Sequence, residues 1–320
     1  MSARVLVTGA TGFIGGVLCE QLASAGYLVR AALRRERDVP SSIAETRIVG
    51  DIGGGTDWSA ALEGVDYIVH TAARVHVLHD DRTNAGMYAE TNAIGTQRLA
   101  VDAAKARVRR FVYLSSIKVN GEETIERPYT ATDEAQPVDS YGASKWQAER
   151  HLRRVATEHS LEFAIVRPPL VYGPGVRANF LRLLRWVDKE RPLPLGAVRN
   201  RRSLVSVWNL TDMIGALLRH PDGGTGRVWM VSDGQDLSTT ELIQRMAVAM
   251  GKRARLLPIP VSMLHVAGHL LGRSAEIARL CGSLCVDIAP ARARLGWCPP
   301  VSVDEGLART AVWYTESARG

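Results

Sequence analysis

An apolar run that breaks into regularly spaced glycines opens the chain and limits what its first part can fold into. Residues 5–7 read Val-Leu-Val, and Gly9, Gly12 and Gly15 follow. Such a run is typical of a strand buried on both faces, and the glycines allow a sharp turn into a helix. Free N–H groups at a helix start attract anions. The pattern predicts a strand, turn and helix that bind a dinucleotide, the alternative being an ordinary βα turn.

The rest of the first half continues this alternation of strand and helix. Apolar runs predict strands at residues 28–33, 47–49, 67–70, 111–114 and 163–166, and amphipathic stretches predict helices at 17–25, 88–106 and 141–158. Strands that alternate with helices form parallel sheets covered on both faces, with right-handed crossovers. We therefore expect an α/β fold with a Rossmann-type doubly wound parallel sheet.

The composition changes after Arg167-Pro168-Pro169, where prolines and glycines cluster at residues 173–175 and 191–196. Such clusters are typical of loops between shorter elements. We expect a dinucleotide-binding domain over 1–170 and a smaller C-terminal α/β substrate lobe over 171–320. Residues 203–220 predict a further strand and helix that return to the first domain.

Charge and composition narrow the class of protein. The 320 residues are 46% hydrophobic and 23% charged, which is typical of a globular protein. The formal charge of +7 is spread over scattered lysines and arginines, so no nucleic-acid partner is predicted. The first strand begins near residue 4, and no apolar run is long enough to span a bilayer. A cytoplasmic location without membrane insertion is the expectation.

The cysteines and two histidines do not predict a metal site. Cys281 and Cys285 are four residues apart, which predicts one helix face rather than a zinc clip, and all four cysteines are expected to be reduced core residues. His265 and His269 have the same spacing but no third ligand nearby. The apolar residues 261–271 that include them are expected to pack against the smaller lobe, with weak peripheral association with a membrane as the alternative.

A phenol and an ammonium at helical spacing are the strongest candidates for chemistry. Tyr141 and Lys145 are four residues apart, so they lie one turn apart on one face of the predicted helix. A nearby cation lowers the pKa of a tyrosine, as proton exchange near neutral pH requires. Ser116 ends the preceding strand, from which its hydroxyl could reach the same substrate oxygen.

Taken together, these motifs resemble the extended short-chain dehydrogenase/reductase family over nearly the whole chain. The resemblance rests on the turn at residues 8–15, Ser116, the pair Tyr141 and Lys145, Arg167-Pro168 and residues 171–175. The branch most similar is that of nucleotide-sugar epimerases, dehydratases and 4-reductases. It implies a bound NAD(P), a UDP-sugar substrate and a homodimer formed through the helices at 88–106 and 141–158.

The resemblance also implies roles for individual residues. Tyr141 would be the general acid and base, Lys145 would hold the nicotinamide ribose and lower the pKa of Tyr141, and Ser116 would orient the reacting oxygen. The cofactor would contact Gly9, Thr11, Gly12, Phe13, Ile14, Gly15, Arg34, Arg35, Asp51, Ile52, Ala72, Ala73, Lys145 and Pro168. The substrate would contact Lys118, Asn179, Leu195, Arg202 and Arg279. Solvated side chains are the alternative for Lys118 and Arg202.

The cofactor preference depends on the end of the second strand. NAD-specific folds usually have an acidic residue there, which binds the ribose. This chain has Leu33 followed by Arg34 and Arg35, which suit a 2′-phosphate. NADP(H) is therefore preferred, and NAD(H) stays possible because Glu36 or Asp38 could fold back.

Three functions follow, in order of preference. Ile117 and Lys118 stand where the dehydratase branch has an acidic pair, so dehydration is disfavoured. Residues 116–122 and 279–287 are similar to bacterial 4-reductases and 4-epimerases that make quinovosamine or fucosamine. The first expectation is an NADPH-dependent 4-keto reductase of a UDP-2-acetamido-2,6-dideoxy-hexos-4-ulose for surface polysaccharide (O-antigen, lipopolysaccharide) biosynthesis. The alternative is an NAD-dependent UDP-sugar 4-epimerase acting on glucose or N-acetylglucosamine, and a non-catalytic NADPH-sensing protein comes last.

Overall fold

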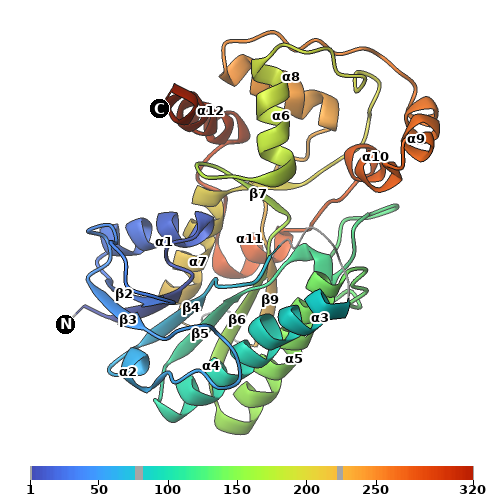
Figure 1. Ribbon diagram of the computed structural model, residues 1–320. Coiled ribbons are helices and arrows are strands. Elements are labelled where there is room, and N and C mark those ends of the chain that lie inside the picture. The colour runs from blue at the N-terminus through green and yellow to red at the C-terminus, as the bar shows by residue number, and fades with distance from the viewer. Residues whose placement is uncertain (1, 76–81, 222–225, 320) are drawn as a thin grey trace.

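A parallel seven-stranded sheet forms the larger part of the molecule (Figure 1). The computed structural model describes residues 2–75, 82–221 and 226–319. The strand order is β3-β2-β1-β4-β5-β6-β9, which is that of a Rossmann-type doubly wound sheet. The strands are β1 (Arg4–Thr8), β2 (Leu28–Leu33), β3 (Glu45–Ile48), β4 (Tyr67–His70), β5 (Arg110–Leu114), β6 (Glu162–Arg167) and β9 (Arg227–Met230). The expected fold class is confirmed.

Helices cover both faces of this sheet because successive strand residues point to opposite sides. In β1, Val5 and Val7 belong to one apolar cluster and Leu6 to the other, and all three are fully buried. The first cluster lies under α1 (Phe13–Ser24), α7 (Val207–Arg219) and α11 (Ala289–Leu295). The second lies under α2 (Ser59–Leu62), α4 (Gly95–Lys105) and α5 (Ser140–His159).

The helix expected at residues 88–106 is interrupted. It consists of α3 (Arg82–Tyr88), a π-helical segment at Ala89–Ile94, and α4. The π-helical turn widens the helix locally and places Asn92 in the interior, where it is 1% exposed. Such insertions are frequent at functional sites.

The second lobe has its own small core. Its helices are α6 (Ala178–Asp188), α8 (Thr239–Ala249), α9 (Val261–Leu270), α10 (Ser274–Cys281) and α12 (Val303–Arg319). Leu184, Val187, Ile243 and Leu307 are buried in its apolar cluster. Figure 1 shows this lobe above the ends of the sheet strands.

Residues 203–220 form the expected strand and helix, but only the helix packs on the large sheet. The strand β8 (Leu204–Ser206) pairs with β7 (Leu170–Tyr172) in a separate two-stranded parallel sheet, because β9 occupies the edge beside β6. The helix α7 packs against α1 and contributes Leu210, Ile214 and Leu217 to the core of the large sheet.

Two expectations about the cysteines are wrong. Cys281 ends α10 and Cys285 lies beyond it in an extended segment, so they do not share a helix face. The helix stops because the next residue, Gly282, is extended. Cys19 and Cys285 are buried and Cys281 is half-buried, but Cys298 is exposed and is therefore not a core residue.

Two features are absent from the described residues. No helix among them is long and apolar enough to cross a membrane. No group of three His, Cys, Asp or Glu side chains within the described ranges could hold a metal ion.

Candidate active site

The glycine turn after β1 is packed so closely that two of its positions exclude any side chain. Gly9 has φ +72, and a Cβ there would lie 2.8 Å from the Ala72 nitrogen. A Cβ on Gly15 would lie 2.0 Å from the Gly9 carbonyl oxygen. Gly15 therefore lets the first turn of α1 rest against the end of β1, which is the packing role of the third glycine in dinucleotide folds.

The start of α1 is suited to an anion. Gly12 is its N-cap, no side chain caps it, and no acidic residue lies in its first turn. Its first N–H groups therefore have no intrahelical or side-chain acceptor, and the helix dipole favours negative charge there. A dinucleotide pyrophosphate fits this position, which is flanked by the exposed Thr11 and the half-buried Ile14.

Phe13 joins the turn to the second lobe. Its ring packs against the apolar cluster of that lobe, and Cβ atoms built on Gly173 and Gly175 would lie 3.6 and 3.5 Å from it. Both glycines follow β7 and have positive φ. The expected cofactor residue Phe13 therefore contacts both parts of the molecule.

An exposed ion pair lies where the adenosine end of a dinucleotide is expected. Arg34 follows β2, Asp51 follows β3, and the Arg34 Nε lies 2.8 Å from Asp51 Oδ1. Both side chains are more than three-quarters exposed, at 76% and 84%. Arg35 is exposed beside them, and Ile52 is half-buried. This surface presents two guanidinium groups, which suit NADP(H), and one carboxylate, which suits NAD(H).

A buried histidine connects the ends of β1 and β4 to the π-helical segment. His70 Nδ1 lies 2.6 Å from Thr8 Oγ1, and His70 Nε2 lies 3.0 Å from Thr96 Oγ1. The Ala72 N–H donates to Thr8 Oγ1, and Thr96 Oγ1 donates to the Asn92 carbonyl. The Thr8 hydroxyl therefore donates to Nδ1, and the neutral imidazole carries its hydrogen on Nε2. Burial and the charge of Lys145 lower the pKa of His70 to about 3.

Tyr141 lies in the first turn of α5, beside the residue that caps the helix. The Asp139 Oδ1 accepts a hydrogen bond of 2.7 Å from the Gly142 N–H, which fixes the start of the helix. Ser116 lies beside the Tyr141 phenol. Burial and the Asp139 charge raise the pKa of Tyr141, whereas the Ser116 hydroxyl lowers it. Ser116 and Tyr141 are therefore brought together as the sequence predicts.

Lys145 is buried one turn further along. It is 2% exposed, and its Nζ donates a 2.7 Å hydrogen bond to the Leu114 carbonyl at the end of β5. The same Nζ is 4.6 Å from the centre of the Tyr113 ring. Burial lowers the pKa of Lys145 to about 7, although the Glu149 charge opposes this. The Lys145 ammonium is thus bonded to the strand end.

A buried ion pair that the sequence analysis did not single out fastens α5 to the sheet. Arg167, at the end of β6, donates to both Glu149 carboxylate oxygens at 2.8 and 2.6 Å. The Ser115 hydroxyl donates to Glu149 at 2.6 Å, and Arg167 also donates to Asn120. A glutamate four residues after Lys145 on the same helix face was the available signal.

Asn92 is a second missed residue. Its side chain accepts from the Arg74 N–H at 2.7 Å and donates to the Arg74 carbonyl and to Ser144 Oγ. These bonds tie the segment after β4, which includes Ala72 and Ala73, to the helix that carries Tyr141. This contact could not be predicted from the sequence, because it depends on the π-helical turn.

Lys118 faces carboxylates. Its Nζ lies 2.9 Å from Glu122 and is ion-paired with Asp139. Burial lowers the pKa of Lys118, but the hydrogen bonds that its ammonium donates to these two carboxylates outweigh this effect, and the pKa is raised. Pro168 is buried nearby, where its carbonyl accepts from the Ile117 N–H at 3.0 Å.

The residues expected to contact the substrate differ in exposure. Asn179 and Arg279 are exposed, and Arg279 donates to the Ala275 carbonyl of its own helix. Arg202 donates to the carbonyls of Arg279 and Gly282 at 2.8 and 3.0 Å. Leu195 is buried in the second-lobe core, and its carbonyl accepts from Thr240.

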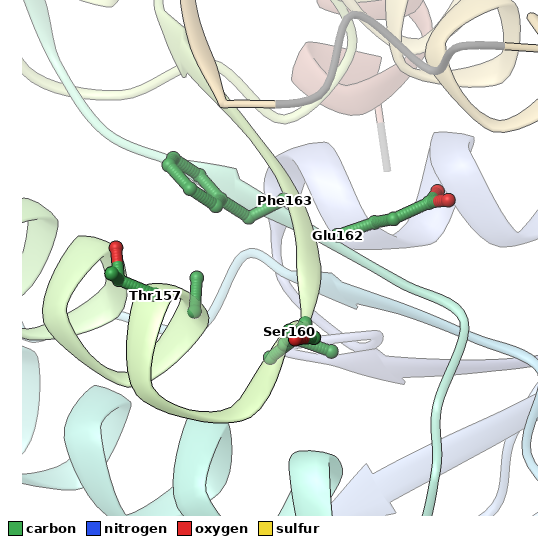
Figure 2. Close-up of a pocket in the computed structure, with 6 residues that line it drawn as sticks. Thr157, Ser160, Glu162 and Phe163 are labelled. Atoms are coloured by element: carbon green, nitrogen blue, oxygen red, sulfur yellow. The ribbon is translucent and has the colours of Figure 1, made fainter.

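Two surface hollows lie away from these residues. One, of about 270 Å³, is lined by residues 156–157 and 160–163 at the end of α5 and the start of β6. Figure 2 shows Glu162 and Phe163 pointing to opposite sides of β6 there. The other, of about 490 Å³, is lined by parts of α2 and α4. Because β6 starts at the opposite end of the strands from Ser116, the first hollow is separate from the candidate active site.

The fold and the arrangement of Ser116, Tyr141 and Lys145 define an extended short-chain dehydrogenase/reductase-type enzyme. More specifically, the chain belongs to the NAD dependent epimerase/dehydratase family, whose model matches residues 5–232. It is 41% identical to a UDP-glucose 4-epimerase of Vibrio cholerae, over 99% of this chain and 97% of that protein.

Two further relatives are more distant. The chain is 28% identical to the N-acetyl-alpha-D-glucosaminyl-diphospho-ditrans,octacis-undecaprenol 4-epimerase of Escherichia coli O157:H7, over 97% of this chain and 95% of that protein. Among solved structures it is similar to MoeE5 in complex with UDP-glucuronic acid and NAD, with 25% identity and a TM-score of 0.77. That likeness covers 98% of this chain and 100% of the other.

Proposed function

We propose that the protein is a UDP-sugar 4-epimerase. The observation that carries this proposal is the placement of Tyr141 beside Ser116 and one helix turn before the buried Lys145, in a chain that is 41% identical to a UDP-glucose 4-epimerase. The relative with an undecaprenol-linked substrate is also named as a 4-epimerase. We therefore put the 4-epimerase, which was the second expectation from the sequence, before the 4-reductase.

In the proposed reaction the protein handles the proton at a sugar hydroxyl. Tyr141 takes the proton from the oxygen on carbon 4 and later returns it, and Ser116 holds that oxygen by a hydrogen bond. A nicotinamide, when bound, supplies reversible hydride transfer at carbon 4. Lys145 would hold the nicotinamide ribose and favour the phenolate. The Ser116 hydroxyl already acts in that direction on the pKa of Tyr141.

A 4-keto reductase that uses NADPH is the second candidate, and one observation favours it. Arg34 and Arg35 follow β2 directly, where a 2′-phosphate would lie. A reductase must exchange its cofactor at each turnover, and NADPH is the usual source of reducing equivalents. Against this, Arg34 is already paired with Asp51.

The nucleotide part of the substrate is proposed to bind at the second lobe, within residues 171–320, although α7, β9 and α11 of that range belong to the large sheet and its core. Asn179 and Arg279 have exposed side chains that suit a diphosphate. Arg202 would have to exchange two carbonyl partners for phosphate oxygens, and Leu195 would contribute through the loop that it anchors. A homodimer through α4 and α5 is part of the same proposal.

Identifying the nucleotide released from the purified, denatured protein tests the proposal. Stoichiometric NAD, together with interconversion of UDP-glucose or UDP-N-acetylglucosamine and its 4-epimer without added cofactor, is the expected result. An empty protein that consumes NADPH with a UDP-4-keto sugar would contradict epimerisation and favour the reductase. Binding of NADPH without any turnover would indicate the sensor. In the epimerase assay Tyr141→Phe should lower kcat about 10²- to 10⁴-fold while the cofactor stays bound.

A further inference from the structure

The ring of Tyr113 lies against the ammonium of Lys145 between the sheet and α5. Tyr113 is in β5 and is fully buried, and the Lys145 Nζ lies over its ring, 4.6 Å from the ring centre. A cation is attracted to the face of an aromatic ring within about 6 Å of its centre. The sequence analysis did not single out Tyr113, and the proposed reaction gives it no role.

Few other groups stabilise the charge of Lys145. An ammonium has three donors, and within the described ranges the hydrogen bond from Nζ goes to the Leu114 carbonyl. The nearest carboxylate on the same helix is that of Glu149, but both of its oxygens already accept from Arg167, at 2.8 and 2.6 Å. Lys145 is therefore a buried cation without a carboxylate of its own, and the ring of Tyr113 is the electron-rich group that faces it.

The other ionisable groups around Lys145 supply no negative charge to it. His70 of β4 stacks on Tyr113, with 5.7 Å between the ring centres, and is neutral because burial and the Lys145 charge lower its pKa to about 3. Burial holds the pKa of Tyr113 well above its ordinary value and also raises that of Tyr141, so both phenols are neutral. Arg167 of β6 is itself a cation. The π-helical segment and the start of α4 contribute side chains that do not ionise, namely Asn92 and Thr96.

We propose that Tyr113 is a positioning residue, whose ring face holds the Lys145 side chain in its ammonium form one helix turn from Tyr141. The inference rests on the proposed function, in which Lys145 favours the phenolate and holds the nicotinamide ribose. The charged amine favours the phenolate, whereas the neutral amine does not. Burial lowers the pKa of Lys145 to about 7, so the ammonium is close to losing its proton at neutral pH. A ring that stabilises the charged form therefore decides which form is the major one.

The ring of Tyr113, and not its hydroxyl, carries this role. A cation is attracted by the negative face of an aromatic ring, which phenylalanine shares with tyrosine and leucine lacks. Phe111 offers a matched comparison because it lies two residues earlier in β5, belongs to the same apolar cluster and is fully buried. Its ring also packs on His70, with 5.9 Å between the ring centres. No cation lies over the Phe111 ring among the described residues, so its loss affects packing alone.

Titration of Lys145 by nuclear magnetic resonance tests the inference without any measurement of turnover. The chain has five lysines, so isotope-labelled lysine side chains give few signals, and Lys145→Met identifies the one that belongs to Lys145. Tyr113→Leu should lower the midpoint of its titration by about one pH unit, because the charged form loses its aromatic partner. Tyr113→Phe and Phe111→Leu should leave the midpoint within a few tenths of a unit of the wild type.

A second replacement at the same position keeps the shape of the ring. Pentafluorophenylalanine in place of Tyr113 fills the space of an aromatic side chain but has a positive ring face, so it repels a cation. Its midpoint should lie about one unit or more below that of Tyr113→Phe. The inference is overturned if neither the leucine nor the fluorinated variant displaces the midpoint. It is equally overturned if Phe111→Leu displaces it as far as Tyr113→Leu.

The pH dependence of epimerisation is the second readout. In Tyr113→Leu the limb of the kcat/KM profile that Lys145 controls should move to lower pH by the same amount as the titration midpoint, and Tyr113→Phe should follow the wild-type profile. A lower kcat with no displacement of either limb would show that Tyr113 serves packing alone and would overturn the inference. Failure of the proposed function is distinct, because the wild type would then not interconvert a UDP-sugar and its 4-epimer, and the titration of Lys145 would still decide the role of Tyr113.

Discussion

Lys118 lies two residues after Ser116, and its ammonium forms ion pairs with two carboxylates. One of them, Asp139, caps the helix that carries Tyr141 and raises the pKa of that tyrosine. Lys118 therefore neutralises a charge that would otherwise disfavour the phenolate. This positioning role is available to Lys118 whether or not it also contacts a substrate.

Replacing Lys118 by methionine should move the pH dependence of turnover. Asp139 would lose its partner, so the pKa of Tyr141 should rise further, and the pH at which kcat/KM reaches half its maximum should increase by about one unit. Lys105→Met removes an exposed lysine on α4 and serves as the control. An increase in KM with no displacement of the pH profile would show instead that Lys118 binds the substrate.

Variants of Arg34 and Asp51 test whether the protein prefers NADP(H) or NAD(H). Arg34→Ala, and likewise Arg35→Ala, should weaken binding of NADPH roughly 10- to 100-fold and leave NADH nearly unchanged, since a charged hydrogen bond to the 2′-phosphate is lost. Asp51→Asn should strengthen NADPH because it releases Arg34. Titration of both nucleotides by fluorescence measures these effects, with Arg37→Ala as the control. Equal losses for both nucleotides would remove the 2′-phosphate assignment.

His70 should make the protein sensitive to acid. Its pKa is about 3 in the fold, against about 6.5 in an unfolded chain, because burial disfavours the imidazolium. Between these values the unfolded chain binds more protons, so the free energy of unfolding falls as the pH decreases from 6.5 towards 3. Urea unfolding at pH 7.5 and pH 5 should show a smaller difference for His70→Gln than for the wild type. An unchanged difference would mean that burial in the fold does not keep the imidazole neutral.

At the scale of elements, α5 is held to the sheet by the buried pair of Glu149 and Arg167. Breaking a buried pair leaves an uncompensated charge in the interior, so Arg167→Met should cost about 3–5 kcal/mol in the free energy of unfolding. Glu149→Met with Arg167→Met should recover most of that loss. Glu158→Gln, which removes an exposed pair on the same helix, should cost less than about 0.5 kcal/mol. If urea denaturation gave the same loss of unfolding free energy for the buried and the exposed pair, the Glu149–Arg167 pair would not be what holds α5 to the sheet.

The strands that could be predicted are those buried on both faces. Residues 28–33 and 67–70 are strands with the expected bounds, since apolar side chains fill both sides of each. The helix α1 begins at Phe13 rather than residue 17, because Gly15 is part of its first turn. The strand β9 is only four residues long, and nothing local distinguishes it. The π-helical turn at Asn92 was equally hidden, because the apolar spacing around it stays helical.

In the candidate site, too, nearby residues predict some positions and not others. Ser116 and Tyr141 meet because a strand end and a helix start are each set by nearby residues. The Arg279 carbonyl that Arg202 contacts lies 77 residues along the chain, and the Ser144 hydroxyl that Asn92 contacts lies 52 residues along it, so only the assembled fold brings these groups together. The sequence therefore indicates candidate reacting groups but not the side chains that hold them in place.

For the whole molecule, the large sheet does not end where the first half of the chain ends. Leu210, Ile214 and Leu217 of α7 are fully buried against α1, and β9 supplies the seventh strand. A chain that stops at residue 170 lacks both. We expect such a fragment to show no cooperative unfolding transition, as measured by circular dichroism during heating, whereas residues 1–232 should retain one. A cooperative transition in the shorter fragment would show that residues 1–170 fold alone.

The late arrival of β9 also has a consequence for a ribosome making this protein. Once β6 has been made, its outer edge has no partner until the chain has grown from residue 167 to residue 227. At about 5–20 residues per second this takes roughly 3–12 s. During that interval the nascent chain presents an apolar strand edge, which is a template for pairing with other chains. Overproduction should therefore lose more protein to inclusion bodies when translation through residues 168–226 is slowed than when it is slowed after residue 232.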